Sequence, residues 1–413
     1  MKKTVAVALI LVMALALFAC AGGNDGNNTS PANNEPSAGA SGSPSASASA
    51  SPSGSASASS TPASSEPSIL SDPFAKSDST VGFVSDDVDH WARDPYNVIY
   101  YSTAVSILVG GIAEALEQFG KTYNFTLEHL TANGDRDAYF NILNTVLLKN
   151  PDGLIIDVQP EMSSRAAEIL EENNLPAISL QNKPVDSNGV CLVPCVIMDQ
   201  IHNGNKSVEF LNNVYKDYWG DIDRSEIMLL ILDYSSSIDI NLRSQGAEQK
   251  WKELFGDQPF IIGDVAAESF TPEGGYNVTN SIISTNPNVK YWFIYGSTED
   301  ITLGATRAVE DLGKDDTVLT VATGVSVLPR EWDAGYEGSW IAIYYVPPAL
   351  YAGPAVFGLL ALMDGRATND TLWQDYFLAG DKAARFTLNA DVVPKSRYLD
   401  YNNEILRGFG IDT

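Results

Sequence analysis

The stretch Asn150-Pro151-Asp152-Gly153-Leu154-Ile155-Ile156-Asp157-Val158-Gln159-Pro160 holds the pattern that decides the fold. Its Pro-Asp-Gly turn signal is followed at once by a short apolar run and then by polar residues. Such a run is typical of a strand that is buried on both faces of a parallel sheet. This strand would present Asp157 and Gln159 at its carboxyl end, which is where open α/β sheets bind their ligands.

A second stretch, residues 287–299, repeats the same order. It reads Pro-Asn-Val-Lys-Tyr-Trp-Phe-Ile-Tyr-Gly-Ser-Thr-Glu, with a turn, an apolar strand and a polar tip. Two strands of this kind in one chain predict two α/β lobes that face a shared cleft.

Apolar runs and helical periodicities alternate along the rest of the chain, and this alternation predicts parallel sheets with right-handed crossovers. We expect strands at residues 80–84, 125–130, 153–156, 176–180, 227–232, 260–262, 290–295, 318–321 and 341–343. We expect helices at residues 105–119, 142–147, 166–170, 243–255, 277–284, 303–312 and 349–363, with a loop at 90–93, a helix stop at Gly120 and a turn at Thr323 and Gly324. The tail should add crossover segments or an edge strand.

The composition narrows the class of protein. The chain has 413 residues, more than one typical domain, and 44% of them are hydrophobic, so a substantial core is available. With 52 acidic against 25 basic residues, the formal net charge is -27. Binding to phosphate backbones needs a cationic surface, so this charge argues against a nucleic-acid partner. It also disfavours a highly anionic ligand.

The first 20 residues have the layout of a secretory signal. Lys2 and Lys3 precede an apolar run, residues 5–18, that is short for a membrane span. Leu17-Phe18-Ala19-Cys20 resembles the bacterial lipobox, whose cysteine becomes the lipidated first residue of the mature protein. The alternative is an ordinary secreted protein with an incidental cysteine at this position.

Residues 21–79 consist mainly of Ser, Ala, Gly, Pro and Asn, with almost no large apolar side chains. Such a segment cannot offset its ordering entropy by burial, so we expect a disordered tether with a reach of roughly 40 Å. A lipid anchor followed by a tether predicts that the folded part is held at the outer face of the cell membrane.

Cys191 and Cys195 lie close together in Cys-Leu-Val-Pro-Cys. A zinc site would need more ligands, and the chain has only three histidines and no second Cys pair. A local disulfide can form outside the cytoplasm if Pro194 bends the backbone, because residues four apart in a regular strand are too distant to bridge. Two free, buried thiols are the alternative.

Six short patterns follow one another in the order of one known family. They are Ala-Asn-Gly-Asp at 132–135, Pro-Asp-Gly-Leu-Ile-Ile at 151–156, Asn-Leu-Pro-Ala-Ile at 174–178, Asp199 with Gly204 and Lys206, Arg-Ser-Gln-Gly at 243–246 and Leu-Gly-Ala at 303–305. Together they resemble the type I periplasmic-binding-protein family, as in the sugar-binding lipoproteins of bacterial ABC importers. The resemblance runs from about Thr80 to the C-terminus. No helix-turn-helix precedes it, which sets aside the related DNA-binding repressors.

The resemblance implies an α/β fold of two Rossmann-like lobes with parallel sheets, joined by a multi-strand hinge. The N-terminal lobe would comprise residues 80–198 and about 345–385, and the C-terminal lobe residues 199–344 and about 386–413. It implies a monomer without cofactor or metal that closes around a small polar solute and delivers it to an ABC permease in the membrane. A sugar is the leading ligand class, and a nucleoside or another polyol is the alternative.

Recognition of a neutral polyol calls for aromatic faces and for planar side chains that bind hydroxyls in pairs. Buried polar groups give such a site its selectivity, because an unmet one is costly. Side chains of these types fall at or near the predicted strand tips, where we expect the ligand-binding residues to be Asp86, Asp87, Trp91, Asp157, Gln159, Asn182, Ser235, Arg243, Thr298, Glu299, Thr323 and Tyr345.

Several of these residues also have a structural alternative. Arg243 matches an arginine that contacts ligand hydroxyls in the family, or it forms an ion pair across a helix start. Asp157 binds ligand or caps the following helix. Trp91 stacks on ligand or covers the rim of the first lobe. Glu299 binds ligand or complements a helix dipole, and Tyr345 serves the cleft or the hinge.

Two positions depart from the family pattern. The sugar binders carry Asn-Asp where this chain has Thr298-Glu299, and Asp-Gly where it has Thr323-Gly324. These departures leave the exact ligand open. Trp332 and Trp340 are expected to pack in the core rather than to contact ligand.

The sequence contains no constellation of catalytic residues. The serines at 235–237 have no nearby histidine, and no Gly-x-Ser-x-Gly elbow or Gly-rich phosphate loop occurs. His90, His129 and His202 lack metal-ligand spacing. We therefore expect a binding protein and not an enzyme. The alternatives from other classes are a sensory protein that reports to a membrane kinase and a cell-surface glycosidase, which would need two carboxylates at catalytic separation.

Overall fold

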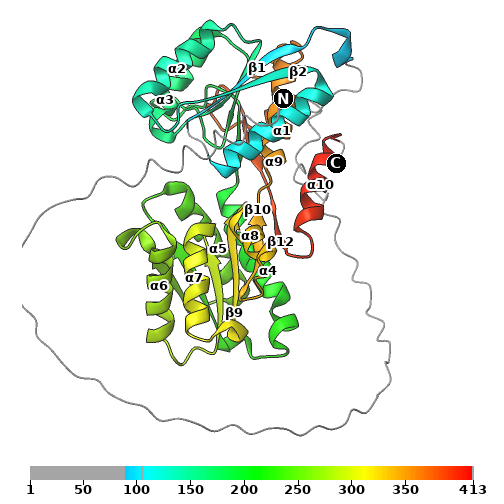
Figure 1. Cartoon of the computed structure of the whole chain (residues 1–413). Coiled ribbons are helices and arrows are strands. Elements are labelled where there is room, and N and C mark those ends of the chain that lie inside the picture. The colour runs from blue at the N-terminus through cyan, green and yellow to red at the C-terminus, as the bar shows by residue number, and fades with distance from the viewer. Residues whose placement is uncertain (1–88, 104–105, 412–413) are drawn as a thin grey trace, which may run out of the picture. The chain divides into compact units, whose positions relative to one another are not determined.

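The computed structural model describes residues 89–103 and 106–411, which form two α/β lobes (Figure 1). The six-stranded sheet of the first lobe has the order β11 (Arg385–Leu388), β5 (Cys195–Met198), β4 (Ala177–Leu180), β3 (Gly153–Asp157), β1 (Tyr96–Ser102) and β2 (Phe125–Thr131). The six-stranded sheet of the second lobe has the order β12 (Asp391–Pro394), β10 (Trp340–Tyr345), β9 (Val318–Gly324), β8 (Tyr291–Gly296), β6 (Ile227–Asp233) and β7 (Phe260–Asp264). Every pairing is parallel except that of β12 with β10. The predicted fold class is confirmed.

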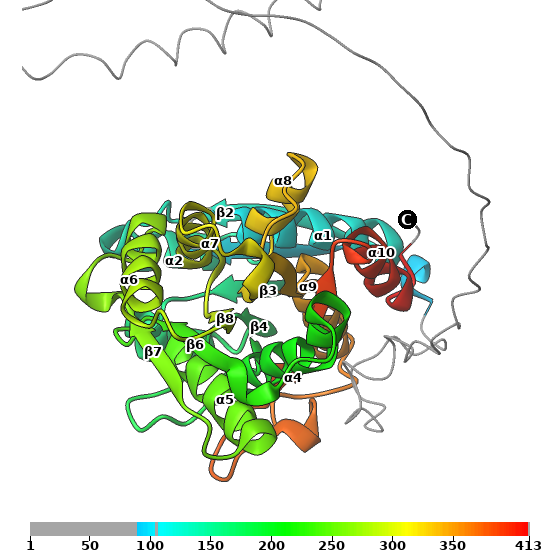
Figure 2. The same cartoon turned by 90° about the horizontal axis from the view of Figure 1, so that it is seen from below.

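Helices cover both faces of each sheet. In the first lobe, α1 (Ile107–Tyr123) and α9 (Pro348–Met363) pack on one face, and α2 (Arg136–Leu148) and α3 (Ser163–Asn173) on the other. In the second lobe, Figure 2 shows the sheet between the pair α4 (Gln200–Trp219) and α5 (Ile238–Phe255) and the pair α6 (Pro272–Thr285) and α7 (Glu299–Asp311). The short α8 (Val327–Asp333) follows β9, and α10 (Tyr398–Gly408) follows β12. Single 3-10 turns lie at His90–Ala92, Pro160–Met162, Arg224–Glu226, Val265–Ala267, Asp315–Thr317 and Gln374–Tyr376.

The apolar run of β3 is continuous because both faces of the strand are covered by helices. Ile155 packs in the cluster that contains α1 and α9, whereas Leu154 and Ile156 pack in the cluster that contains α2 and α3. All three side chains are fully buried. A strand that is covered on both faces has no solvent side, so its polar residues lie at its ends. This arrangement puts Asp157 and Gln159 at the carboxyl edge of the sheet, as predicted.

The helices and strands predicted between residues 105 and 363 are present, with ends that differ by a few residues. The tail adds β11 and β12, each at the edge of one sheet, as expected. The prediction missed β1, β5, α4, α8 and α10. Strand β1 carries a continuous buried run at residues 98–101, so its local pattern resembles that of β3. The buried face of α4 begins with the small or polar residues Asn203 and Ser207, which weakens its apolar stripe.

Several predicted boundaries are wrong. Helix α1 does not stop at Gly120 but runs to Tyr123, where Asn124 adopts a left-handed conformation and its N–H bonds to the Gly120 carbonyl. Residues 90–92 form a 3-10 turn instead of a loop, and Thr323 and Gly324 are the last residues of β9 instead of a turn. The chain crosses to the second sheet between Leu388 and Asp391, close to the predicted return at about residue 386.

Several predictions lie outside the described residues. They are the signal at 1–20 with Cys20, the tether at 21–79, the strand at 80–84, Asp86 and Asp87. Within residues 89–103 and 106–411, no helix has both the length and the apolar character that crossing a membrane requires. The apolar α9 is a buried core helix, as expected.

Helices α4 and α5 cross with their backbones in direct contact, and two glycines allow it. A Cβ atom on Gly204 would lie 1.9 Å from the carbonyl oxygen of Arg243, and one on Gly246 would lie 2.1 Å from that of Ile201. Since both obstacles are backbone atoms, no side-chain rotation can relieve the clash. The contact brings Gln200, at the start of α4, next to Arg243 on α5.

Gly246→Ala is therefore expected to destabilise the protein by about 1–3 kcal/mol, because the two helices must move apart. Gly110→Ala in α1 is the matched control, since a Cβ atom there meets no atom within 4 Å and alanine is the better helix former. Urea unfolding followed by circular dichroism measures both variants against the parent. Equal stability of Gly246→Ala and the parent would contradict the backbone contact.

Candidate functional site

Asp157 and Asn182 lie side by side at the carboxyl edge of the first sheet. Strands β3 and β4 pair with Asp157 opposite Leu180, and Asn182 Nδ2 donates a hydrogen bond to Asp157 Oδ1 at 3.3 Å. Asp157 is only 9% exposed, and burial raises the pKa of its carboxyl to about 6 although the Asn182 hydrogen bond opposes this. The carboxyl makes no cap to the helices that follow, so the cap alternative is wrong.

Two amide side chains next to this pair have buried polar atoms without a hydrogen-bond partner in the described part of the chain. They are Oε1 of Gln159, after β3, and Nε2 of Gln181, after β4. Gln181 also has a φ of 66°, a strained conformation for a residue with a side chain. A buried polar group without a partner costs about 1–3 kcal/mol, so these two atoms are candidates for hydrogen bonds with a bound ligand.

Arg243 of the second lobe is held in place by two neutral partners. Its Nε donates to Gln200 Oε1 at 2.6 Å, and its Nη1 donates to the Ser297 carbonyl at 2.8 Å. No carboxylate of the described residues lies within ion-pair distance of Arg243, so the ion-pair alternative is wrong. The guanidinium is fixed on one side and keeps its Nη2 group free of any described partner.

Tyr351 is a tyrosine on α9 whose pKa is affected by the charges of both Asp157 and Arg243. It is buried, and burial raises its pKa to about 12, an effect that the charge of Arg243 opposes and the charge of Asp157 adds to. The charges of the two predicted residues thus influence the pKa of one tyrosine, although their hydrogen bonds go to other partners: Asn182 for Asp157, and Gln200 and Ser297 for Arg243. The sequence analysis missed Tyr351 because it lies within an apolar helix, where nothing distinguishes it from core.

The tip of β8 adds two hydroxyls. The Oγ of Ser297 and the Oγ1 of Thr298 are buried and have no partner among the described residues. Thr298 thus stays in the candidate site, and Ser297 joins it. Ser297 directly follows β8, so the position of strand tips could have identified it from the sequence, as it could Gln181 after β4.

Thr323 is part of a buried network inside the second lobe. Its Oγ1 donates to Asn203 Oδ1 at 2.8 Å, and the Tyr295 hydroxyl lies 3.2 Å from the same Oγ1 and donates to Asn203 Oδ1 at 3.1 Å. These interior contacts use the hydroxyl of Thr323. We therefore remove Thr323 from the candidate site.

Glu299 supports the loop that follows β9. Its Oε2 accepts hydrogen bonds from the backbone N–H groups of Val325, Ser326 and Val327 at 3.0, 3.0 and 2.8 Å. Its Oε1 accepts from the Ser326 hydroxyl at 3.1 Å. The carboxylate is thus engaged at the start of α8, in agreement with the structural alternative, and we remove Glu299 from the candidate site.

Ser235 lies on an exposed loop after β6. Its hydroxyl donates to Asp264 Oδ2 at 2.5 Å, and its N–H donates to Asp264 Oδ1 at 3.2 Å. Asp264 also caps the 3-10 turn that follows β7. Ser235 therefore joins the tips of β6 and β7 and is at most a peripheral member of the site.

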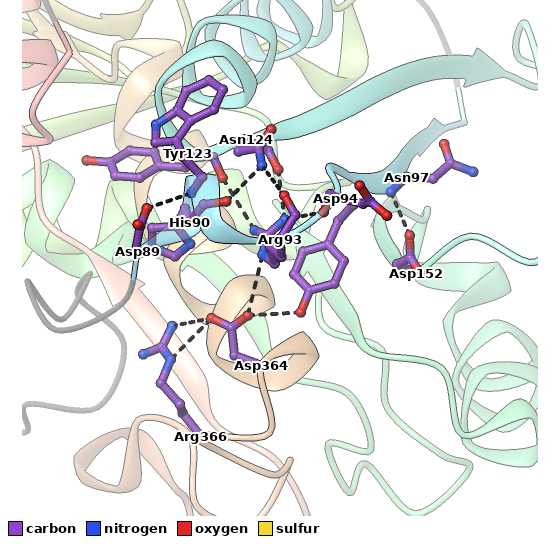
Figure 3. A network of polar contacts seen from close by, with 12 residues as sticks. Asp89, His90, Arg93, Asp94, Asn97, Tyr123, Asn124, Asp152, Asp364 and Arg366 are labelled. Atoms are coloured by element: carbon purple, nitrogen blue, oxygen red, sulfur yellow. Dashed lines mark hydrogen bonds and ion pairs between the residues drawn. The ribbon is translucent and has the colours of Figure 1, made fainter.

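Trp91 lies at the opposite end of the first sheet from Asp157. It precedes the amino end of β1, and the carbonyl of its neighbour His90 accepts a hydrogen bond from Asn124, just before β2 (Figure 3). Its side chain is 65% exposed. Arg93, which follows, is held by the carbonyl of Asn124 and lies 4.0 Å from Asp364. This network organises the amino edge of the sheet, and we remove Trp91 from the candidate site.

Tyr345 and two tryptophans pack instead of lining a cleft. Tyr345 is buried, and the centroid of its ring lies 6.3 Å from that of Tyr398 and 6.1 Å from that of Tyr401, both on α10. This packing agrees with the alternative that Tyr345 serves the hinge between the lobes. Trp332 and Trp340 are buried too, and Trp332 lies 5.7 Å from Tyr398. Both tryptophans pack in the core, as expected.

Two cavities open beside Asn182, and residues of both lobes line them. The larger has a volume of about 520 Å³ and the smaller about 250 Å³, and both are bordered by Lys183 of the first lobe and Asp239 of the second. Gln181 and Gln200 line the smaller cavity. Among the described residues, no group of three or more His, Cys, Asp or Glu side chains could hold a metal ion.

The structure thus has two α/β lobes with parallel sheets, and residues of both lobes line the same two cavities. Residues 98–330 match the family model of periplasmic binding proteins and the sugar binding domain of the LacI family, and the chain belongs to this family.

Curated relatives agree with this family. The chain is 22% identical over 232 residues to the L-arabinose-binding periplasmic protein of Escherichia coli (strain K12). The aligned region covers 54% of this chain and 69% of that protein. It is 24% identical over 206 residues to the ABC transporter L-arabinose-binding periplasmic protein of Azospirillum brasilense, which covers 48% of this chain but only 59% of that protein. These relatives are binding proteins and not enzymes.

Solved structures share the fold. A D-allose-bound periplasmic solute binding protein of an ABC transporter from Actinobacillus succinogenes 130z superimposes with a TM-score of 0.56 at 16% identity, covering 75% of this chain and 100% of that one. A sugar-binding protein of a sugar ABC transporter from Bacillus halodurans gives a TM-score of 0.58 at 13% identity, covering 74% and 99%.

Asp157→Asn is expected to stabilise the unliganded protein at neutral pH. Folding raises the carboxyl pKa from 3.8 to about 6, so the contribution of this group to stability is full below pH 3.8 and is lost as the pH rises through about 6. The difference corresponds to about 3 kcal/mol, so the variant should exceed the parent by up to that amount at pH 7 and match it near pH 4. Urea unfolding across this pH range measures the gap.

Asp186→Asn is the control of opposite sign. Hydrogen bonds from the backbone N–H groups of Val190 and Asn188 lower the pKa of the Asp186 carboxyl, so this variant should lose stability at neutral pH and approach the parent as the pH falls. If the difference in unfolding free energy between Asp157→Asn and the parent did not change with pH, this result would contradict a buried, ionised Asp157.

Proposed function

We propose that the chain is the extracytoplasmic, lipid-anchored solute-binding component of an ABC import system and that it binds a small sugar between its two lobes. The observation that carries the proposal is that residues of both lobes line the same two cavities, with Gln181, Asn182 and Lys183 from the first lobe and Gln200, Ser237 and Asp239 from the second. Capture between lobes requires polar groups of both lobes to border one region, and this shared lining supports it.

The chemistry of the region favours a neutral polyol. Asp157 accepts hydrogen bonds, the Arg243 guanidinium donates them, and the amides of Gln159 and Gln181 and the hydroxyl of Thr298 complete a set that can bind several sugar hydroxyls. A sugar would satisfy the buried atoms that lack partners and so remove their cost. The ligands named for related structures, D-allose, L-arabinofuranose and myo-inositol, are of this class.

The connections between the lobes support capture by closure. The chain passes from the first sheet to the second after β5, returns after β10 and crosses again between β11 and β12. Short parallel connections of this kind allow rotation of one lobe against the other. A ligand that contacts both lobes only when they are closed shifts the population towards the closed state, in which the permease would receive it.

A thermal-shift screen of the full chain against pentoses, hexoses, inositols, nucleosides and amino acids tests the ligand class. At least one sugar or inositol should raise the melting temperature, because a ligand at 100 times its Kd stabilises by about 2.7 kcal/mol. Nucleosides and amino acids should leave it unchanged. A response to amino acids or nucleosides alone would exclude the sugar assignment.

Calorimetric titration of the responding sugar then tests the site. Arg243→Lys should weaken binding at least 10-fold, since charge-assisted hydrogen bonds contribute about 1.5–3 kcal/mol and the ammonium cannot replace the fork of the guanidinium. Arg165→Lys is the matched control, because the Arg165 side chain is exposed on α3 and forms an ion pair with Glu168 at 3.2 Å. Equal affinity of Arg243→Lys and Arg165→Lys would remove Arg243 from the site.

The lipid anchor has its own test. Cys20→Ser is expected to move the exported chain from the membrane fraction to the soluble fraction, because the hydrophobic attachment is lost. Cell fractionation followed by immunoblotting measures the distribution, with Cys191→Ser as the control that keeps the anchor. Retention of Cys20→Ser in the membrane fraction would refute lipidation at this position.

A further inference from the structure

Cys191 and Cys195 lie side by side in the folded protein. Both side chains are fully buried, and their Sγ atoms are 4.0 Å apart. The chain bends at Val193, just before Pro194, so the two residues are not in one straight strand. This bend meets the condition that a bridge between residues four apart requires.

One neighbouring segment holds the backbone on both sides of the pair. The N–H of Cys191 donates to Asp381 Oδ1 at 2.9 Å, and its carbonyl accepts from the N–H groups of Lys382 and Ala383 at 2.9 and 3.1 Å. The N–H of Cys195 donates to the carbonyl of Ala384 at 3.0 Å. Since both ends of the bend are anchored to residues 381–384, the two thiols stay near each other.

The surroundings favour one thiolate and exclude a metal. The hydrogen bond with Cys195 and the charge of Arg385 lower the pKa of Cys191, whereas the pKa of Cys195 is raised. Asp381 holds Arg385 beside the pair, with Oδ1 and Oδ2 each 2.7 Å from a guanidinium nitrogen. Within the described chain, no third ligand completes a metal site around the two sulfurs.

We propose that Cys191 and Cys195 form a disulfide in the exported protein. The proposal rests on the extracytoplasmic location in the proposed function, because disulfides persist in that compartment. The sulfurs must approach by about 2 Å to reach the bond length of about 2.05 Å, which rotation of the two short side chains can provide.

The oxidant is a protein disulfide of a thiol oxidase. The Cys191 thiolate attacks one oxidant sulfur, which forms a mixed disulfide and releases the second oxidant sulfur as a thiolate. The Cys195 thiolate then attacks the Cys191 sulfur and releases the first oxidant sulfur. Two electrons pass to the oxidant, which leaves as a dithiol with the two protons. Residues 381–385 cover both cysteines in the folded protein, so the exchange takes place before this segment docks.

The bond would stiffen one wall of the larger cavity. Cys191 forms a β-bridge with Val185, and Val185, Gly189 and Arg385 line that cavity. Arg385 also donates to the Gly189 carbonyl at 2.8 Å. The disulfide would hold this loop next to β5, the last strand before the chain crosses to the second lobe.

Peptide mapping of the full chain tests the proposal. The protein is recovered from the surface of producing cells, alkylated with iodoacetamide in denaturant and digested with trypsin, which leaves both cysteines in one peptide, residues 166–206. This peptide should be about 2 Da lighter than the dithiol form and carry no alkyl group, and prior reduction should add two alkyl groups. The control is the same chain produced in the reducing cytosol, in which both cysteines are expected to be alkylated.

A second measurement covers stability. Reductant should lower the melting temperature of the surface protein by about 5 °C, and the variant with both Cys191→Ser and Cys195→Ser should not respond. Two alkylated cysteines in the surface protein, or a bond from either one to Cys20 or to another chain, would overturn the proposal. Sugar titration of the same sample distinguishes failure of the disulfide proposal from failure of the proposed function. A protein that contains the disulfide but binds no sugar would refute the proposed function and leave the disulfide proposal intact.

Discussion

A parallel sheet that is covered by helices on both faces has no solvent-facing side along its strands, and this constraint determines where the chain can place polar groups. The interiors of β3 and β8 consist of buried, mostly apolar residues that alternate between two cores. Polar side chains therefore gather where the strands end. Asp157 and Thr298 stand at such ends, and the candidate site follows from the packing of the sheets rather than from any local motif.

The second lobe shows how backbone packing supports a functional side chain. Because Gly204 and Gly246 lack side chains, α4 and α5 touch, and Gln200 comes within hydrogen-bond distance of Arg243. The guanidinium is thus oriented by an amide and a backbone carbonyl that carry no net charge. An ion pair would have neutralised the group, whereas these partners fix its direction and leave its charge available to a ligand.

Much of the fold could be predicted from the sequence because its signals are local. The turn and apolar run of β3 identify a buried strand without knowledge of the rest of the chain, and the same holds for β8. Strand β1 carries the same kind of local signal, a continuous buried run at residues 98–101, so it too could have been predicted.

The site was harder to predict because a polar side chain at a strand tip can meet the cleft or the interior. Thr323 turns inward to Asn203, which lies 120 positions earlier in the chain, and Glu299 binds backbone groups 26 to 28 positions later. These partners come together only through the tertiary fold. Arg243 was identified by resemblance, whereas the sequence could not show that its partners are neutral. Tyr351 required knowledge of how α9 packs on its sheet.

In the proposed site, the buried carboxyl of Asp157 would couple ligand binding to the release or uptake of a proton. A group whose pKa is about 6 is partly protonated in mildly acidic water, so the empty protein exists in two charge states there. Binding of the solute and binding of the proton are then reciprocally coupled. A solute that binds the ionised form more tightly causes the protein to release a proton, and a solute that binds the protonated form more tightly causes it to bind one. The pH of the surroundings would then change the affinity of the proposed site for its ligand.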